Sequence, residues 1–309
     1  MMSIIQERIN IFSHLENSPE SEYKDKQENE NENMQEITLS YLKVTPQTGI
    51  QKDSSILFLH GILGDARTWL PYLHQFPEFE TIALTQSGFG QDTHSPELFD
   101  TQRHAKELIA FCKALNQQEN RPERKFIIVA WSYACHVSLL AAKLAPELFK
   151  SLTLYELIVP SYGISEGQQT DFTKDLTKMM SPIIKAYRRG KPAAAVDHFI
   201  SACKNAQYSL SDQKADIQQI KQENAASLSK LLTQKEPEPI TPEALLAINQ
   251  KVPITIFYGG NSRDIFQISS QAGMKAIGQS KGMIEDADHL LPEENPQKLI
   301  ALLQDILTQ

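Results

Sequence analysis

The sequence predicts an α/β protein with a doubly wound, mostly parallel sheet and a helical cap inserted between strands six and seven. Short apolar runs alternate with amphipathic helical runs up to residue 160, the pattern of a parallel sheet covered on both faces. Over residues 161–250 strand signals vanish and helical runs replace them, until strand signals return at Val252. We therefore expect a core of residues 37–160 and 251–309, with residues 161–250 forming the cap.

The composition and net charge of the chain restrict the kinds of partner that it could bind. The chain has 309 residues, of which 41% are hydrophobic and 22% are charged, which is the composition of an ordinary soluble globular protein, and its net charge is −8. Because no large basic cluster offsets the negative charge, we expect no nucleic-acid partner. No run approaches the ~18 uninterrupted apolar residues of a membrane span. We expect a small-molecule substrate and a monomer or homodimer.

The three cysteines, Cys112, Cys135 and Cys203, lie far apart in the sequence. Their spacing fits neither a zinc site nor a disulfide framework, so they indicate reduced core residues. The first residues carry charges every few positions and lack the apolar segment of a signal peptide. We therefore expect a cytoplasmic protein without a metal.

The first 36 residues are expected to be a disordered or loosely attached arm. Residues 1–16 have the spacing of a short amphipathic helix, with apolar residues such as Ile5, Ile9 and Phe12 roughly on one side. From Glu16 to Glu36 the sequence is dominated by Ser, Glu, Asn, Lys and Gln, which cannot bury enough apolar surface to offset the entropy lost on ordering.

Strands are predicted from short apolar runs in chain order. Residues 37–44 alternate strictly and indicate an edge strand, whereas residues 54–60 are continuously apolar, as in a covered central strand. Further strands are expected at residues 81–85, 125–130, 152–159, 252–258 and 282–285, with core helices at residues 102–115, 134–144 and 296–307. Alternation of these strands and helices predicts the parallel sheet.

The stretch around Ser132 carries the strongest functional signal. A buried strand ends at Trp131, and an apolar helix starts two or three residues later, so Ser132 lies at a sharp strand-to-helix turn. Such a turn exposes a serine hydroxyl and aims the helix N-terminus at a developing oxyanion. The usual motif is Gly-x-Ser-x-Gly, whereas here Ala130 and Ala134 stand at the glycine positions.

Several motifs in order resemble the α/β-hydrolase superfamily over residues 37–309, in its capped, esterase-like branch. They are His60-Gly61 after the third strand, the loop Ser87-Gly88-Phe89-Gly90 after the fourth, the turn Ala130 to Ala134, Tyr155-Glu156 ending the sixth strand, and Asp288-His289-Leu290 near the C-terminus. The resemblance implies the α/β-hydrolase fold and a cofactor-free enzyme.

A serine needs a base and an orienting acid to act as a nucleophile. His289 follows the last predicted strand and should therefore lie at the same sheet edge as Ser132. For the acid, the position that the superfamily most often uses is held by Ser262, which leaves two candidates. Glu156 ends strand six, where some branches carry the acid, and Asp264 lies two residues beyond the usual place; we favour Glu156.

The resemblance also assigns the remaining parts of the site. The oxyanion hole would come from the backbone N–H groups of Tyr133 and Ile62. Gly61 would let the loop pass close to the substrate, His60 would brace that loop beside the substrate, and Trp131 would line the acyl pocket.

The expected function is hydrolysis of an ester or related acyl bond of a small, largely apolar substrate by Ser132, His289 and an acid. Two alternatives stay open at this point. The same fold supports cofactor-free lyase or C–C bond-cleaving reactions, because fold alone does not set the chemistry. A hydrolase-like binding protein without activity is the other alternative, suggested by the alanines of the turn and the missing acid after strand seven.

Overall fold

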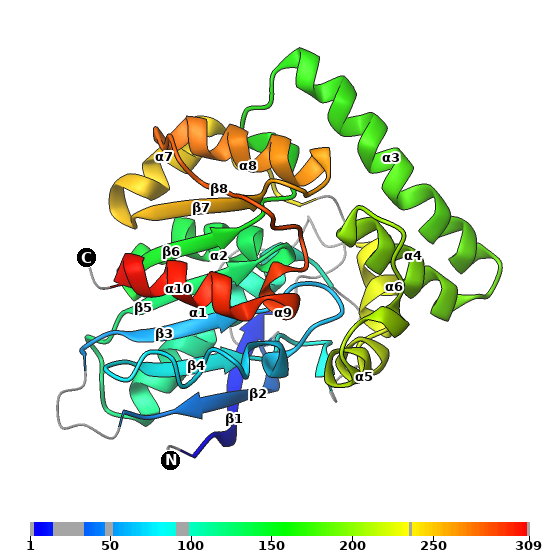
Figure 1. Ribbon diagram of the computed structural model, residues 1–309. Helices are drawn as coiled ribbons and strands as arrows, with labels where there is room; N and C mark the ends of the chain where they lie inside the picture. The colour runs from blue at the N-terminus through cyan, green and yellow to red at the C-terminus, as the bar shows by residue number, and fades with distance from the viewer. Residues whose placement is uncertain (1–2, 15–33, 47–51, 91–98, 235–236, 308–309) are drawn as a thin grey trace, which may run out of the picture.

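The described residues of the computed structural model, 3–14, 34–46, 52–90, 99–234 and 237–307, form an eight-stranded sheet flanked by helices (Figure 1). The spatial order of the strands is β1-β2-β4-β3-β5-β6-β7-β8. Their bounds are β1 Ile5–His14, β2 Met34–Val44, β3 Ser55–Leu59, β4 Glu80–Leu84, β5 Phe126–Trp131, β6 Phe149–Tyr155, β7 Ile254–Gly259 and β8 Met283–Ile284.

From β4 to β8 every neighbouring pair of strands is parallel, and β2 pairs antiparallel with both β1 and β4. All residues of β3, β4 and β5 are buried, as their continuous apolar runs predict for strands covered on both faces. Figure 1 shows α10 crossing in front of the strands, with α1 and α2 behind them. The predicted doubly wound, mostly parallel sheet is confirmed.

The core helices are α1 Thr101–Gln118, α2 Tyr133–Leu144, α8 Asp264–Ile277, α9 Leu291–Glu294 and α10 Pro296–Leu307. Local signals set where several helices begin. The Asp100 carboxylate accepts a hydrogen bond from the Arg103 amide at the start of α1. No described helix is long and apolar enough to cross a membrane.

Between β6 and β7 the chain runs through α3 Glu166–Arg188, α4 Pro192–Lys204, α5 Ala215–Glu223, α6 Ala226–Thr233 and α7 Pro242–Lys251. A capping box at Ser165 starts α3, and the Gly190-Lys191-Pro192 break separates α3 from α4. Helices α3 to α6, called the inserted helices below, lie beyond the C-terminal ends of the central strands (Figure 1). In contrast, α7 packs against α2 and α8 beside the sheet.

The N-terminal prediction is wrong for residues 5–14. These residues form β1, which pairs antiparallel with β2 along its whole length instead of forming a helix. Ile9 and Ile11 are buried while Phe12, on the opposite face, is exposed, because pairing with β2 imposes a period of two. Ile5, the first residue of the strand, is exposed although it lies on the face of Ile9. Residues 5–14 therefore belong to the sheet rather than to a loose arm. The stretch 15–33, most of the expected disordered segment, lies outside the described residues.

Two predicted strands also change length. The edge strand β2 begins at Met34 instead of residue 37. The strand expected over residues 152–159 starts earlier, at Phe149, and ends at Tyr155, because Glu156 adopts a left-handed backbone with φ 63°. This bend removes the Glu156 side chain from the alternation of the strand and directs it elsewhere, as described next.

Candidate active site

Ser132 occupies a strained turn between β5 and α2. Its backbone has φ 58° and ψ −120°, a region that residues with a side chain rarely adopt. The Ser132 amide donates to the Tyr155 carbonyl at 3.0 Å, and the Ser132 carbonyl accepts from the Cys135 amide at 2.9 Å. Ala130 and Ala134 are both buried, so the turn accommodates a methyl group at each glycine position of the usual motif.

The loop after β3, residues 60–65, passes directly beside the serine. A Cβ atom added to Gly61 would lie 3.1 Å from the Ser132 Cβ, closer than side-chain carbons ordinarily approach. Ile62 follows in this loop, and Tyr133 starts α2 directly after the serine. Within the described residues, neither the Ile62 nor the Tyr133 amide makes a hydrogen bond, so both donors remain open for an oxyanion.

His289 and Glu156 form a buried pair. The His289 Nδ1 lies 2.5 Å from Oε2 of Glu156, and both side chains are inaccessible to solvent or nearly so. Oε1 of Glu156 accepts from the Gly259 amide at 2.8 Å and from the Ser262 hydroxyl. The carboxylate is therefore fully hydrogen-bonded, as a buried charge requires. A carboxylate can only accept a hydrogen bond, so the contact with Glu156 places the proton of the His289 ring on Nδ1. Nε2 is then left as an acceptor.

Two aromatic side chains fix the plane of the His289 ring. The Phe266 ring stacks on it with centroids 3.9 Å apart and planes 9° apart. The Trp131 ring lies 5.5 Å away between centroids, and Trp131 directly precedes Ser132. The imidazole is thus held by one hydrogen bond and two rings, one of which belongs to the residue before Ser132.

The two candidate acids, Glu156 and Asp264, differ in their contact with His289. Asp264 is the first residue of α8 and is exposed, and it makes no hydrogen bond to His289. Ser262, at the position where the superfamily most often has the acid, donates to Glu156. The contact to His289 thus comes from strand six, because the left-handed backbone of Glu156 turns its carboxylate toward β7 and the His289 loop.

His60 is completely buried, and both ring nitrogens contact main-chain groups. Nε2 accepts from the Gln86 amide at 3.1 Å, and Nδ1 donates to the Gly61 carbonyl at 2.9 Å. Burial lowers the pKa of His60 to about 4, so the ring is neutral near neutral pH. The residue joins the loops after β3 and β4, and neither nitrogen is left for a substrate.

Trp131 and Tyr133 flank the serine with buried side chains. The Tyr133 hydroxyl bonds to His104 Nδ1 at 2.8 Å, which directs the phenol into the scaffold. The indole Nε1 of Trp131 has no hydrogen-bond partner within the described residues. The Lys221 ammonium lies 5.3 Å from the centre of the Trp131 ring, which places helix α5 next to the site.

Several residues at the site carry no sequence signal that would have revealed them. Ser262 and Phe266 contact the Glu156–His289 pair, and Lys221 forms a buried ion pair with Glu293 at 2.5 Å. A lysine in a Gln-rich helical run ordinarily indicates a solvent-exposed face, so the sequence around Lys221 does not predict that this side chain is buried. Its burial depends on where α5 packs.

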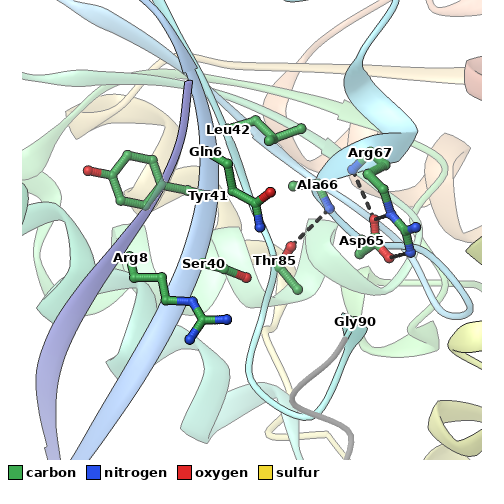
Figure 2. Close-up of a pocket in the computed structure, with 10 residues that line it drawn as sticks. All are labelled: Gln6, Arg8, Ser40, Tyr41, Leu42, Asp65, Ala66, Arg67, Thr85 and Gly90. Carbon is green, nitrogen blue, oxygen red and sulfur yellow. Dashed lines mark hydrogen bonds and ion pairs between the residues drawn. The ribbon is translucent and has the colours of Figure 1, made fainter. Parts of the chain in front are cut away.

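A separate cavity of about 200 Å³ lies between β1, β2 and the turn that follows residues 60–65 (Figure 2). Figure 2 shows Arg67 bonded to Asp65, and the Thr85 hydroxyl accepting from the Ala66 amide at 3.1 Å. None of its lining residues belongs to the predicted catalytic set. The cavity matters here because Asp65 ends the loop that passes Ser132.

Comparisons with known proteins identify the family and the fold. The sequence matches the model described as "Alpha/beta hydrolase family" over residues 56–302. No curated protein matches the sequence significantly. A thermophilic esterase from Thermogutta terrifontis aligns with a TM-score of 0.65 and 18% identity, over 98% of each chain.

Two further solved structures share the fold at low identity. A hydrolase from Oleispira antarctica has a TM-score of 0.66 and 16% identity, over 87% of this chain and 94% of that chain. The enol-lactonase from Burkholderia xenovorans LB400 has a TM-score of 0.63 and 13% identity, over 88% of this chain and 97% of that chain. Because the family match spans most of the sequence, the chain belongs to the alpha/beta hydrolase family and is a hydrolase.

Proposed function

We propose that this hydrolase cleaves an ester or related acyl bond through a triad of Ser132, His289 and Glu156. The observation that carries the proposal is the 2.5 Å contact between His289 Nδ1 and the buried Glu156 carboxylate. The neighbours of both residues lead to the strained turn at Ser132, because the His289 ring contacts Trp131 and the Ser132 amide donates to Tyr155, which precedes Glu156. A serine, an imidazole and an orienting acid are the groups that acyl transfer requires.

In the proposed reaction the Ser132 Oγ attacks the carbonyl carbon while His289 Nε2 takes the hydroxyl proton. The Glu156 carboxylate stabilises the resulting imidazolium. The amides of Ile62 and Tyr133 donate to the oxyanion of the tetrahedral intermediate. His289 then gives its proton to the departing alcohol, and an acyl-enzyme remains. A water molecule, deprotonated by His289, releases the acyl group as a carboxylic acid and restores the serine.

We propose a small, largely apolar substrate, with the inserted helices acting as a cap over the site. The rings of Trp131 and Phe266 flank His289, and a carbonyl group that reaches Ser132 therefore meets apolar walls. The structural neighbours include an esterase and an enol-lactonase, and both names point to an acyl–oxygen bond. No step of this mechanism requires a cofactor.

Labelling with a fluorophosphonate tests the triad. We expect wild type to label, Ser132→Ala to lose labelling, and Glu156→Gln to label more slowly by roughly 10²–10⁴-fold, because the amide does not stabilise the imidazolium. Asp264→Asn is the matched control, since Asp264 is exposed and has no bond to His289. It should label like wild type.

Turnover of p-nitrophenyl esters of increasing acyl length tests the substrate class. A small apolar pocket predicts the highest kcat/KM for short, uncharged acyl groups. A wild-type protein that neither labels nor turns over any ester would contradict the triad. Equal slowing by Asp264→Asn and Glu156→Gln would contradict the assignment of the acid.

A further inference from the structure

The loop that contains Ile62 makes two hydrogen bonds with the region of the inserted helices, one as donor and one as acceptor. The Leu63 amide, one residue after Ile62, donates to the Ser227 hydroxyl of α6 at 3.2 Å. The Asn224 amide group, at the end of α5, donates to the Asp65 carboxylate at 2.8 Å. The chain between β6 and β7 thus contacts the loop that carries the Ile62 amide.

Both contacts are fully buried, and Asn224 uses both ends of its amide. Asn224 and Ser227 are 0% exposed. The Asn224 Oδ1 accepts from the Gly90 amide at 2.6 Å, and Nδ2 also donates to the Ile220 carbonyl at 2.9 Å. With all of these bonds made, the Asn224 amide has one orientation, and it joins the loops that follow β3 and β4 to the end of α5.

The loop needs such support because its backbone is strained. Leu63 is buried and has φ 64°, a left-handed conformation that a leucine adopts only when its surroundings require it. On the other side of the loop, Asp65 is held by Arg67, and the next amide, Ala66, donates to Thr85 (Figure 2). The Ser227 bond therefore restrains the strained residue itself, next to the Ile62 amide.

We propose that Asn224 and Ser227 are positioning residues, which hold the Ile62 amide where the oxyanion forms. The inference rests on the proposed acyl-transfer function. An oxyanion donor acts only when its N–H is held close to its productive position, so a loop released by a fraction of an ångström loses transition-state stabilisation. The segment around α5 and α6 is then part of the catalytic geometry as well as a cover.

The kinetic test uses Ser227→Ala and Asn224→Ala, with Ser229→Ala as the matched control. Ser229 lies on the same helix and is partly exposed, and its hydroxyl donates to the Ala226 carbonyl within α6 rather than to the loop. The concentration of active sites is counted by fluorophosphonate labelling taken to completion, so that unfolded protein does not lower kcat. We expect kcat per active site to fall about tenfold in each test variant, with KM and the pH profile unchanged, because the lost interaction exists only in the transition state.

Amide hydrogen exchange gives a second measurement that does not depend on activity. Exchange in residues 61–65 should become faster in Ser227→Ala and Asn224→Ala and stay at the wild-type rate in Ser229→Ala. Unchanged exchange in both test variants, or a wild-type kcat per active site, would overturn the positioning role while leaving the triad intact. If the wild-type protein failed to label, that result would contradict the proposed function. The exchange measurement would still test whether Asn224 and Ser227 restrain the loop.

Discussion

The two halves of the site are supported from different parts of the chain. The proposed acid–base half, His289 and Glu156, is contacted directly by Gly259, Ser262, Phe266 and the Trp131 ring, all of which lie in the core. The inserted helices contact residues beside this half through the ion pairs Lys204–Asp288 and Asp175–Arg263. The oxyanion half, the loop of residues 60–65, is held in addition by Asn224 and Ser227 from the insertion. This difference suggests that changes in the inserted helices alter stabilisation of the oxyanion before they alter proton transfer.

The largest expected effect concerns the ion pair that joins helix α5 of the insertion to α9 of the core. Lys221 of α5 and Glu293 of α9 are both buried, and Glu293 follows His289 closely in the chain. Lys221→Met removes one partner and leaves Glu293 as an unpaired buried charge, which should lower the free energy of unfolding by about 3–5 kcal/mol. Chemical denaturation measures this loss.

Lys143→Met is the control for this variant. Its ion pair with Glu238 is exposed, so the substitution should cost less than about 1 kcal/mol. If both variants lost the same amount of stability, the Lys221–Glu293 pair would not be the buried connection that we describe.

The next effect is a dependence of stability on pH that comes from buried neutral histidines. Burial lowers the pKa of His60, which braces the oxyanion loop, and of His136 to about 4. Between the ordinary value near 6.5 and 4 the unfolded chain binds more protons than the folded one, so stability is present above pH 6.5 and is lost as the pH falls. Between pH 7 and pH 5 each of the two histidines should lower the free energy of unfolding by roughly 2 kcal/mol.

Urea denaturation at pH 7, 6 and 5 measures this loss, and pH 5 stays above the range in which most carboxylates titrate. His136→Gln should remove about half of the contribution from these two histidines. A free energy of unfolding that is constant across this range would contradict the buried, neutral state of both rings.

The smallest expected effect is on the acid–base half. Ser262→Ala removes the hydroxyl donor to Glu156 but leaves the Gly259 amide bond in place. The loss of one hydrogen bond, about 1 kcal/mol, predicts a fall in kcat of roughly fivefold. Steady-state kinetics with an ester substrate measures it.

Hydrogen exchange in residues 61–65 should stay at the wild-type rate in Ser262→Ala, because the two halves have separate supports. Faster exchange in these residues would show that the two halves are coupled and would contradict their separate support.

Sequence patterns were sufficient for the central sheet and for the nucleophile turn. The continuous apolar runs of β3 and β5 indicate buried parallel strands, and a serine between a strand and a helix indicates the turn. Residues 5–14 were misjudged because Ile5, Ile9 and Phe12 fit one face of a helix, whereas in the strand Ile9 and Phe12 lie on opposite faces. Only pairing with β2, which comes from a distant part of the sequence, decides between the two.

The choice of acid shows where sequence patterns stop. Glu156 and Asp264 are both carboxylates near strand ends, and spacing alone allowed either to reach His289. The structure places Glu156 against His289 because a left-handed residue ends β6 and turns the side chain, a backbone state that the sequence does not announce for a glutamate. The roles of Ser262 and Phe266 likewise depend on contacts between segments that meet only in the folded chain.

By itself, the sequence determined the alternation of strands and helices, the position of the inserted helices and the identity of Ser132 and His289 as candidate catalytic residues. Each follows from local periodicity or from chemistry at a single turn, which neighbouring residues control. The tertiary structure decided which carboxylate meets His289, where the N-terminal segment pairs, and which residues of the insertion hold the loop beside Ser132. Those outcomes depend on long-range contacts, whose partners are far apart in the chain and leave no local pattern.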